Sequence, residues 1–109
     1  MQHDGIRLQH MLDAGKDALQ FAFGRERTDL EKDRMLALAL IKALEIIGEA
    51  ASKISDNLKA EHPEIPWLEI TGMRNRMIHA YYDVNLDVVW QTIKSDLPDL
   101  LKSLERILK

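Results

Sequence analysis

The sequence has no cysteine and no long apolar run. Without cysteine there can be no disulfides, thiolate zinc sites, iron–sulfur ligation or cysteine nucleophiles. The longest apolar stretches, such as residues 35–41, are far shorter than the ~18 residues of a membrane-spanning helix. The first five residues also lack the charged and apolar regions of a signal peptide. We therefore expect a soluble, cytoplasmic protein.

An excess of positive charge is also missing. The chain has 15 lysines and arginines against 18 acidic residues, which gives a net charge of −3. A general electrostatic affinity for nucleic acid is therefore not expected, and any role on RNA must depend on a local patch. The length of 109 residues, with 46% hydrophobic and 30% charged residues, predicts one globular domain over residues 1–109.

Glycine and proline are scarce, at five and three residues, and apolar residues recur every three or four positions. This pattern predicts an all-α fold, an up-and-down bundle of about five helices. Gly24 is expected to end the first helix, and Thr28 with Glu31 matches the capping box that would begin the second. Pro98 predicts a kink, or a restart capped by Asp96. The expected helices cover residues 6–23, 28–54, 55–61, 66–80 and 85–108.

The apolar run at residues 35–41 leaves the second helix apolar around most of its circumference. A helix of this kind is normally enclosed on several sides. Because one small chain offers few helices to enclose it, and most soluble homo-oligomers have two-fold symmetry, we expect a homodimer.

The chemistry-bearing segment is residues 72–82, where arginine, asparagine, histidine and tyrosine side chains lie close together. In a helix Asn75 and His79 are neighbours at i and i+4, whereas Arg74 lies about 140° around the axis from His79. A guanidinium binds phosphate oxygens, and an imidazole can exchange a proton near neutral pH. These groups suit metal-free RNA cleavage, with Arg74 stabilising charge on the phosphoryl group and His79 as general base or acid.

The same residues have a purely structural interpretation. A histidine at the end of a helix interacts favourably with the helix dipole, and the arginines can pair with carboxylates such as Glu45, Glu49 or Asp83. Spacing alone leaves both interpretations open.

The pattern of Arg74, Asn75, His79 and Tyr81 resembles the signature of the HEPN superfamily, in particular of HepT-like toxins that are paired with minimal nucleotidyltransferases. The resemblance covers nearly the whole chain. Segment 44–50 is similar to the family's second-helix motif, segment 65–67 to the stretch before the signature, and segments 88–90 and 96–98 to its last helices. The N-terminal 27 residues match only loosely.

The resemblance implies a homodimeric, metal-independent endoribonuclease without a cofactor, which acts on tRNA or mRNA as the toxin of a type VII-like toxin–antitoxin system. It gives Arg74 and His79 catalytic roles and Asn75 a supporting role. It also implies that the cognate nucleotidyltransferase antitoxin adenylylates Tyr81, and not Tyr82. An alternative from another class is a catalytically silent helical subunit that docks or presents substrate to a nucleotidyltransferase.

Other polar residues have two interpretations each. Glu45 and Glu49, at i and i+4, could be carboxylates that orient Arg74 or the solvated edge of their helix. His62 between two glutamates is expected in a surface loop and not in a metal site, and His10 is expected to be solvated. Trp67 and Trp90 are expected to anchor the core or an interface and not to stack on bases.

Overall fold

The computed structural model describes residues 3–78 and 85–109, and every regular element in this part of the chain is helical. The prediction of an all-α fold is therefore confirmed. None of these helices has both the length and the apolar composition needed to cross a membrane. In chain order the elements are α1 (Asp4–Ala22), α2 (Asp29–Lys32), α3 (Arg34–Ser52), α4 (Asp56–Glu61), α5 (Trp67–Ile78), α6 (Leu86–Gln91), the π-helical turn η2 (Thr92–Asp96) and α7 (Leu97–Leu108).

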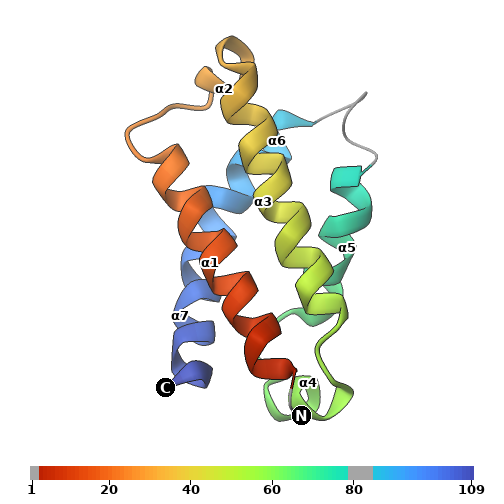
Figure 1. The fold of residues 1–109 in the computed structure, drawn as a ribbon. Coiled ribbons are helices and arrows are strands. Elements are labelled where there is room, and N and C mark those ends of the chain that lie inside the picture. The colour runs from red at the N-terminus through yellow and green to blue at the C-terminus, as the bar shows by residue number, and fades with distance from the viewer. Residues whose placement is uncertain (1–2, 79–84) are drawn as a thin grey trace.

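Three packed seams hold the long helices together. α3 lies between α1 and α5 and packs against both, and α7 packs along the other side of α1 (Figure 1). Gly15 marks the closest approach of α1 and α7, because a Cβ atom at this position would overlap the side chain of Leu101. The largest fully buried side chains come from α1, α3 and the C-terminal helices: Leu8, Met11, Leu40, Ile41, Leu44, Ile47, Val89, Ile93, Leu97 and Leu104.

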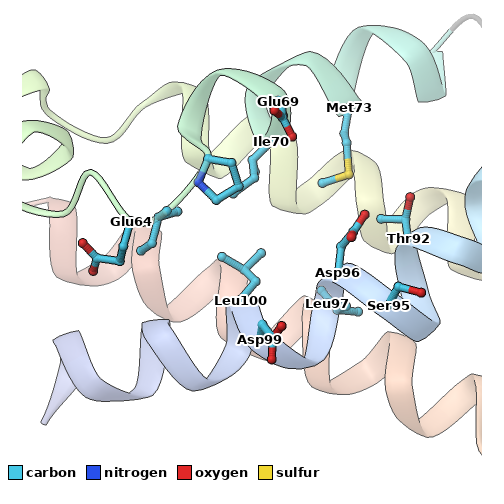
Figure 2. A pocket seen from close by; sticks show the side chains of 12 residues that line it. Glu64, Glu69, Ile70, Met73, Thr92, Ser95, Asp96, Leu97, Asp99 and Leu100 are labelled. Carbon is cyan, nitrogen blue, oxygen red and sulfur yellow. The ribbon is translucent and has the colours of Figure 1, made fainter.

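The fourth possible seam, between α5 and α7, is open over the described residues. A cavity of about 290 Å³ lies there, with α5 on one side and η2 and α7 on the other (Figure 2). The bundle is thus closed along α1 and α3 and hollowed where α5 faces the C-terminal helices.

The expected start of the second helix is wrong. The Thr28 side chain makes no capping hydrogen bond, and the chain forms only the short helix α2 before it turns again at Asp33. The Asp33 carboxylate accepts a hydrogen bond from the Leu36 backbone N–H at 3.1 Å and thereby caps α3. A carboxylate at the N-cap satisfies a backbone donor of the first turn, as the threonine hydroxyl was expected to do.

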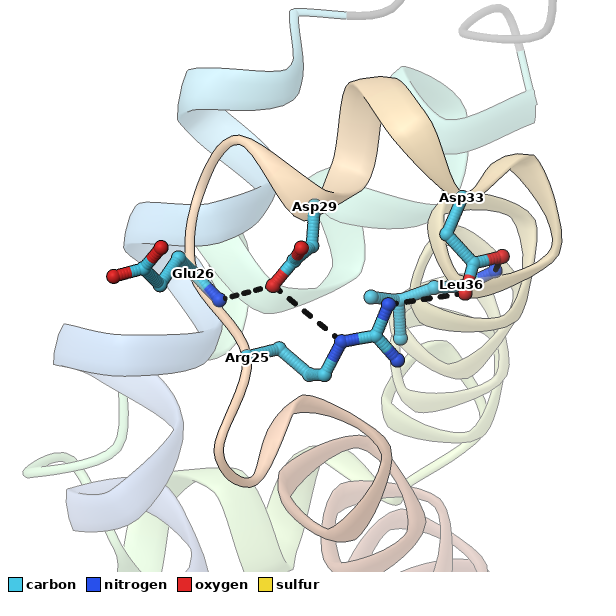
Figure 3. A network of polar contacts seen from close by, with 5 residues as sticks. All are labelled: Arg25, Glu26, Asp29, Asp33 and Leu36. Atoms are coloured by element: carbon cyan, nitrogen blue, oxygen red, sulfur yellow. Dashed lines mark hydrogen bonds and ion pairs between the residues drawn. The ribbon is translucent and has the colours of Figure 1, made fainter.

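Arg25 explains why the chain turns at this point. Its guanidinium lies 3.0 Å from the Asp33 carboxylate and 3.4 Å from that of Asp29, which also accepts a hydrogen bond from the Glu26 N–H (Figure 3). The hydrogen bond to Asp33 raises the pKa of Arg25 above its ordinary value. The Leu36 N–H and then Arg25 lower the pKa of Asp33, and the Glu26 N–H lowers that of Asp29. One arginine therefore joins the loop after α1 to both ends of α2.

Glycine and proline act near their expected positions. α1 ends at Ala22, and Gly24 has a positive φ of 73° in the turn that follows, as expected of a glycine after a helix. Pro98 lies in the first turn of α7, where its missing N–H costs no helical hydrogen bond. The backbone changes geometry in η2, and α7 restarts at Leu97 with Asp96 in the N-cap position, as predicted, but the Asp96 side chain makes no capping hydrogen bond.

A buried carboxylate connects the start of α1 to the start of α4. Asp4 is only 5% exposed and accepts hydrogen bonds from the Ser55 backbone N–H at 2.9 Å and from its hydroxyl at 2.6 Å. Burial alone would raise the pKa of Asp4, but favourable polar interactions, first among them the hydrogen bonds from Ser55, hold the pKa below its ordinary value of 3.8. Ser55 in turn caps α4 through the Leu58 N–H.

The corrected helix start is testable with two alanine substitutions. Asp33→Ala removes the α3 cap and the Arg25 contact, so we expect it to lower the midpoint of urea denaturation clearly. Thr28→Ala removes a side chain without a capping role, so its midpoint should match that of the wild type. Equal losses in the two variants would show that the second helix starts at Thr28 after all.

The Asp4 contact predicts a pH-dependent stability. Because the folded-state pKa is lowered, the stabilisation is complete above pH ~4 and is lost as the pH falls through the folded-state pKa. Asp4→Asn should therefore be less stable than the wild type at neutral pH, and this difference should shrink below pH ~4. Denaturation curves across this range measure it, with the exposed Asp17→Asn as control. A difference that stays constant with pH would contradict the assignment.

Candidate functional site

The segment with the predicted catalytic residues begins on a firmly packed helix. Trp67 opens α5, is buried, and donates its indole N–H to the His62 carbonyl oxygen at 3.0 Å. Ile70 and Met73 follow at helical spacing and are buried as well. The core-anchor interpretation of Trp67 is thereby confirmed, and α5 packs against α3.

The predicted signature starts in the last part of α5. Arg74 and Asn75 belong to this helix, and Asn75 is exposed to solvent. His79, Tyr81 and the neighbouring Tyr82 lie outside the described residues. The expectation that Arg74 and His79 meet in one cleft therefore stays a prediction.

The two predicted carboxylates lie on α3, the helix that packs against α5. Glu45 and Glu49 both line a hollow of about 350 Å³ between α1 and α3. The Glu45 carboxylate lies 3.1 Å from the Lys42 ammonium and its side chain is only 18% exposed, while Glu49 lies 3.5 Å from the Lys53 ammonium. A simply solvated helix edge does not describe Glu45. Whether these carboxylates orient Arg74 stays a prediction.

Sequence reasoning missed the residues that face these carboxylates. Arg7 and His10, one turn apart on α1, line the same hollow as Glu45, Glu49 and Lys42. His10 is exposed to solvent, as expected, but its side chain also lines this hollow. Helical spacing could have placed Arg7 and His10 on one face of α1. It could not show that this face lies beside the glutamates of α3.

The hollow between α1 and α3 has the groups for phosphate and proton chemistry in one place. It holds two permanent cations, Arg7 and Lys42, one imidazole, His10, and the two carboxylates. Cations bind phosphate oxygens, and an imidazole can move protons near neutral pH. α3 lines this hollow and also packs against α5, the helix that carries Arg74.

Two other predicted groups have simpler roles. His62 lies in the turn after α4, with its Nδ1 atom 3.4 Å from the Glu64 carboxylate. No group of three or more metal-binding side chains occurs in the part of the chain that the structure describes. Trp90 is half-buried against the core, and the Lys94 ammonium lies 5.4 Å from its ring centroid, in cation–π geometry.

The helical bundle and the signature that begins at Arg74 define the chain as a protein of the HEPN class. A family model described as "Ribonuclease HepT-like" matches residues 11–107, so the chain belongs to the HepT-like family. No solved structure matches the chain significantly.

Relatives with related names cover most of the chain. It is 36% identical over 102 residues to a "Putative RNase" of Caldanaerobacter subterraneus subsp. tengcongensis, with 94% of this chain and 91% of the relative aligned. It is 47% identical over 77 residues to a "Probable ribonuclease HepT" of Thermococcus cleftensis, at 71% and 70% coverage. A "Putative RNase" of Methanocaldococcus jannaschii is 33% identical over 98 residues, with 90% of each chain aligned.

Proposed function

We propose that this protein is a metal-independent endoribonuclease and the toxin of a toxin–antitoxin pair. The observation that carries the proposal is the HepT-like match over residues 11–107, which contains the complete signature from Arg74 to Tyr81. The names of the relatives, which refer to RNase activity, support the same activity here. The protein acts in the cytoplasm, where its RNA substrates are.

The proposed reaction is an internal phosphoryl transfer. The RNA 2′-hydroxyl gives up its proton to a base and attacks the adjacent phosphorus. The bond from phosphorus to the 5′-oxygen breaks, and the leaving oxygen takes a proton. The products are a 2′,3′-cyclic phosphate and a 5′-hydroxyl end. His79 moves a proton in this reaction as general base or acid, and Arg74 stabilises the negative charge on the phosphoryl oxygens.

The remaining site residues have supporting roles in this proposal. Asn75, one position after Arg74 and exposed on α5, is suited to hydrogen-bond the substrate or to hold His79 at i+4. Glu45 and Glu49 lie on the adjacent helix α3 and would orient the Arg74 guanidinium. No cofactor enters the chemistry.

The active form in this proposal is a homodimer. Several large apolar side chains of the described chain are exposed, among them Met35 on α3, at 79%, and Leu68 on α5, at 88%. Ile46, beside Glu45 on α3, is 39% exposed and lines the hollow between α1 and α3. The exposed Ile46 beside Glu45 favours a partner surface at this hollow.

Neutralisation would occur at Tyr81. A cognate nucleotidyltransferase antitoxin would transfer adenylate from ATP to its hydroxyl oxygen, which loses its proton, and pyrophosphate would leave; this tyrosine comes two residues after His79. The bulky, anionic group would crowd the cleft and repel the RNA phosphate. The alternative function, a silent binding subunit of the nucleotidyltransferase, needs no cleavage by this chain.

The nuclease is tested by cleavage of tRNA and total RNA in excess EDTA. We expect the wild type to cleave and His79→Ala to lose activity by about 100-fold or more, because general acid–base catalysis contributes about 10²–10⁴-fold. Arg74→Ala should lose a comparable factor. His62→Ala, which changes a histidine in a distant turn, and Arg76→Ala, which changes a second arginine of α5, are the matched controls.

Circular dichroism and sedimentation must show that the inactive variants keep their helicity and mass. Equal activity in the wild type and in both site variants would identify a contaminating nuclease. An inert wild type that carries no adenylate, as shown by mass spectrometry, would favour the binding-subunit function.

The antitoxin step predicts a specific modification. Incubation with the cognate nucleotidyltransferase and ATP should add adenylate mass to Tyr81, as peptide mass spectrometry would locate it, and RNA cleavage should stop. Tyr81→Phe should escape both effects, whereas Tyr82→Phe should still be modified. Labelling of Tyr82 alone, or of neither tyrosine, would refute this regulation.

A further inference from the structure

The open seam between α5 and α7 has an apolar floor. Ile65, Ile70 and Met73 come from the α5 side, and Leu97 and Leu100 from α7 (Figure 2). Leu100 is only half-buried and Pro66, at the same cavity, is exposed to solvent. The cavity volume of about 290 Å³ is at the lower limit of small-molecule pockets, which span about 300–1,000 Å³. It has room for a few side chains of a partner.

The rim of the same seam is acidic. Glu64 and Glu69 lie on one side, Asp96 and Asp99 lie on the other, and all four are exposed. No basic side chain is among the described residues that line the cavity. Lys94 directly precedes the lining residues Ser95 and Asp96 in the sequence, and its ammonium lies over the Trp90 ring.

The geometry of the bundle indicates which element fits here. The seams of α1 with α3, α3 with α5 and α1 with α7 are packed, so a further helix is the natural element to fill a trough with helical walls. Amphipathic helices bind such grooves through apolar residues at three- and four-residue spacing. The acidic rim requires a helix with positive charges beside its apolar stripe, because opposite charges at the rim favour encounter and orientation.

We propose that the seam between α5 and α7 is a docking groove for a lysine- or arginine-rich amphipathic helix of a protein partner. Apolar side chains of the partner helix enter the cavity, and its cations pair with the Glu64, Glu69, Asp96 and Asp99 carboxylates. The same carboxylates repel RNA, so a cationic protein segment fits this face better than RNA does. The proposal does not depend on the nuclease activity.

A fluorescein-labelled model peptide tests the groove on the full-length protein. The peptide is helical, with leucines along one face and lysines on both flanks, and a matched peptide has glutamates in place of the lysines. Fluorescence anisotropy should show binding of the lysine peptide only, and this binding should weaken with salt.

Substitutions in the rim should weaken the complex in a graded way. Asp96→Asn/Asp99→Asn removes two charges without a large change in side-chain size, and Asp96→Lys/Asp99→Lys reverses them. We expect about tenfold weaker peptide binding for the reversed pair and an intermediate loss for the neutral pair. Asp17→Lys/Glu105→Lys changes the net charge equally outside the groove and should bind like the wild type.

Three kinds of result would overturn the proposal. The first is equal binding of the lysine and glutamate peptides, or equal losses in the control and groove variants. The second is binding of labelled RNA to the wild type that disappears in the Asp96→Asn/Asp99→Asn variant. The third is a change of oligomeric mass in the groove variants with unchanged peptide affinity, which would assign the groove to a second copy of this chain.

Discussion

The burial of α3 against α1 and α5 is the constraint on which the rest of the structure depends. α3 contributes Leu40, Ile41, Leu44 and Ile47 to the fully buried core, so it sets the positions of its two neighbours. Because α3 is apolar on most sides, it has little surface left for polar groups. Its polar side chains therefore lie on the narrow part of the helix that points away from this core. Glu45 is among them, half-buried in the hollow between α1 and α3.

Charged side chains take part in fixing the starts of α3 and α4. Arg25 and Asp33 decide where α3 begins, and Asp4 connects the start of α1 to the start of α4 through Ser55. A capping box was a reasonable expectation at Thr28, but a carboxylate that serves both a backbone N–H and a guanidinium is the stronger acceptor. The loop between α1 and α3 is therefore a folded corner and not an extension of α3.

The two hollows of the described chain differ in charge, and this difference separates their roles. The hollow between α1 and α3 mixes Arg7, His10 and Lys42 with carboxylates, which suits phosphate and proton chemistry. The cavity between α5 and α7 is lined by carboxylates and apolar groups, which suits a cationic protein segment.

The sequence by itself determined the helical class, the anchoring role of Trp67, the role of Gly24 and the HepT-like signature, because periodicity, backbone restrictions and local motifs are properties of neighbouring residues. It did not determine where α3 begins, since the contact of Arg25 with the capping Asp33 carboxylate forms only after the loop folds back. Nor could it place Arg7 and His10 beside Glu45 and Glu49, or leave the seam between α5 and α7 open. These features depend on how the helices are rotated and spaced against one another, and the packing of side chains in the tertiary structure decides that.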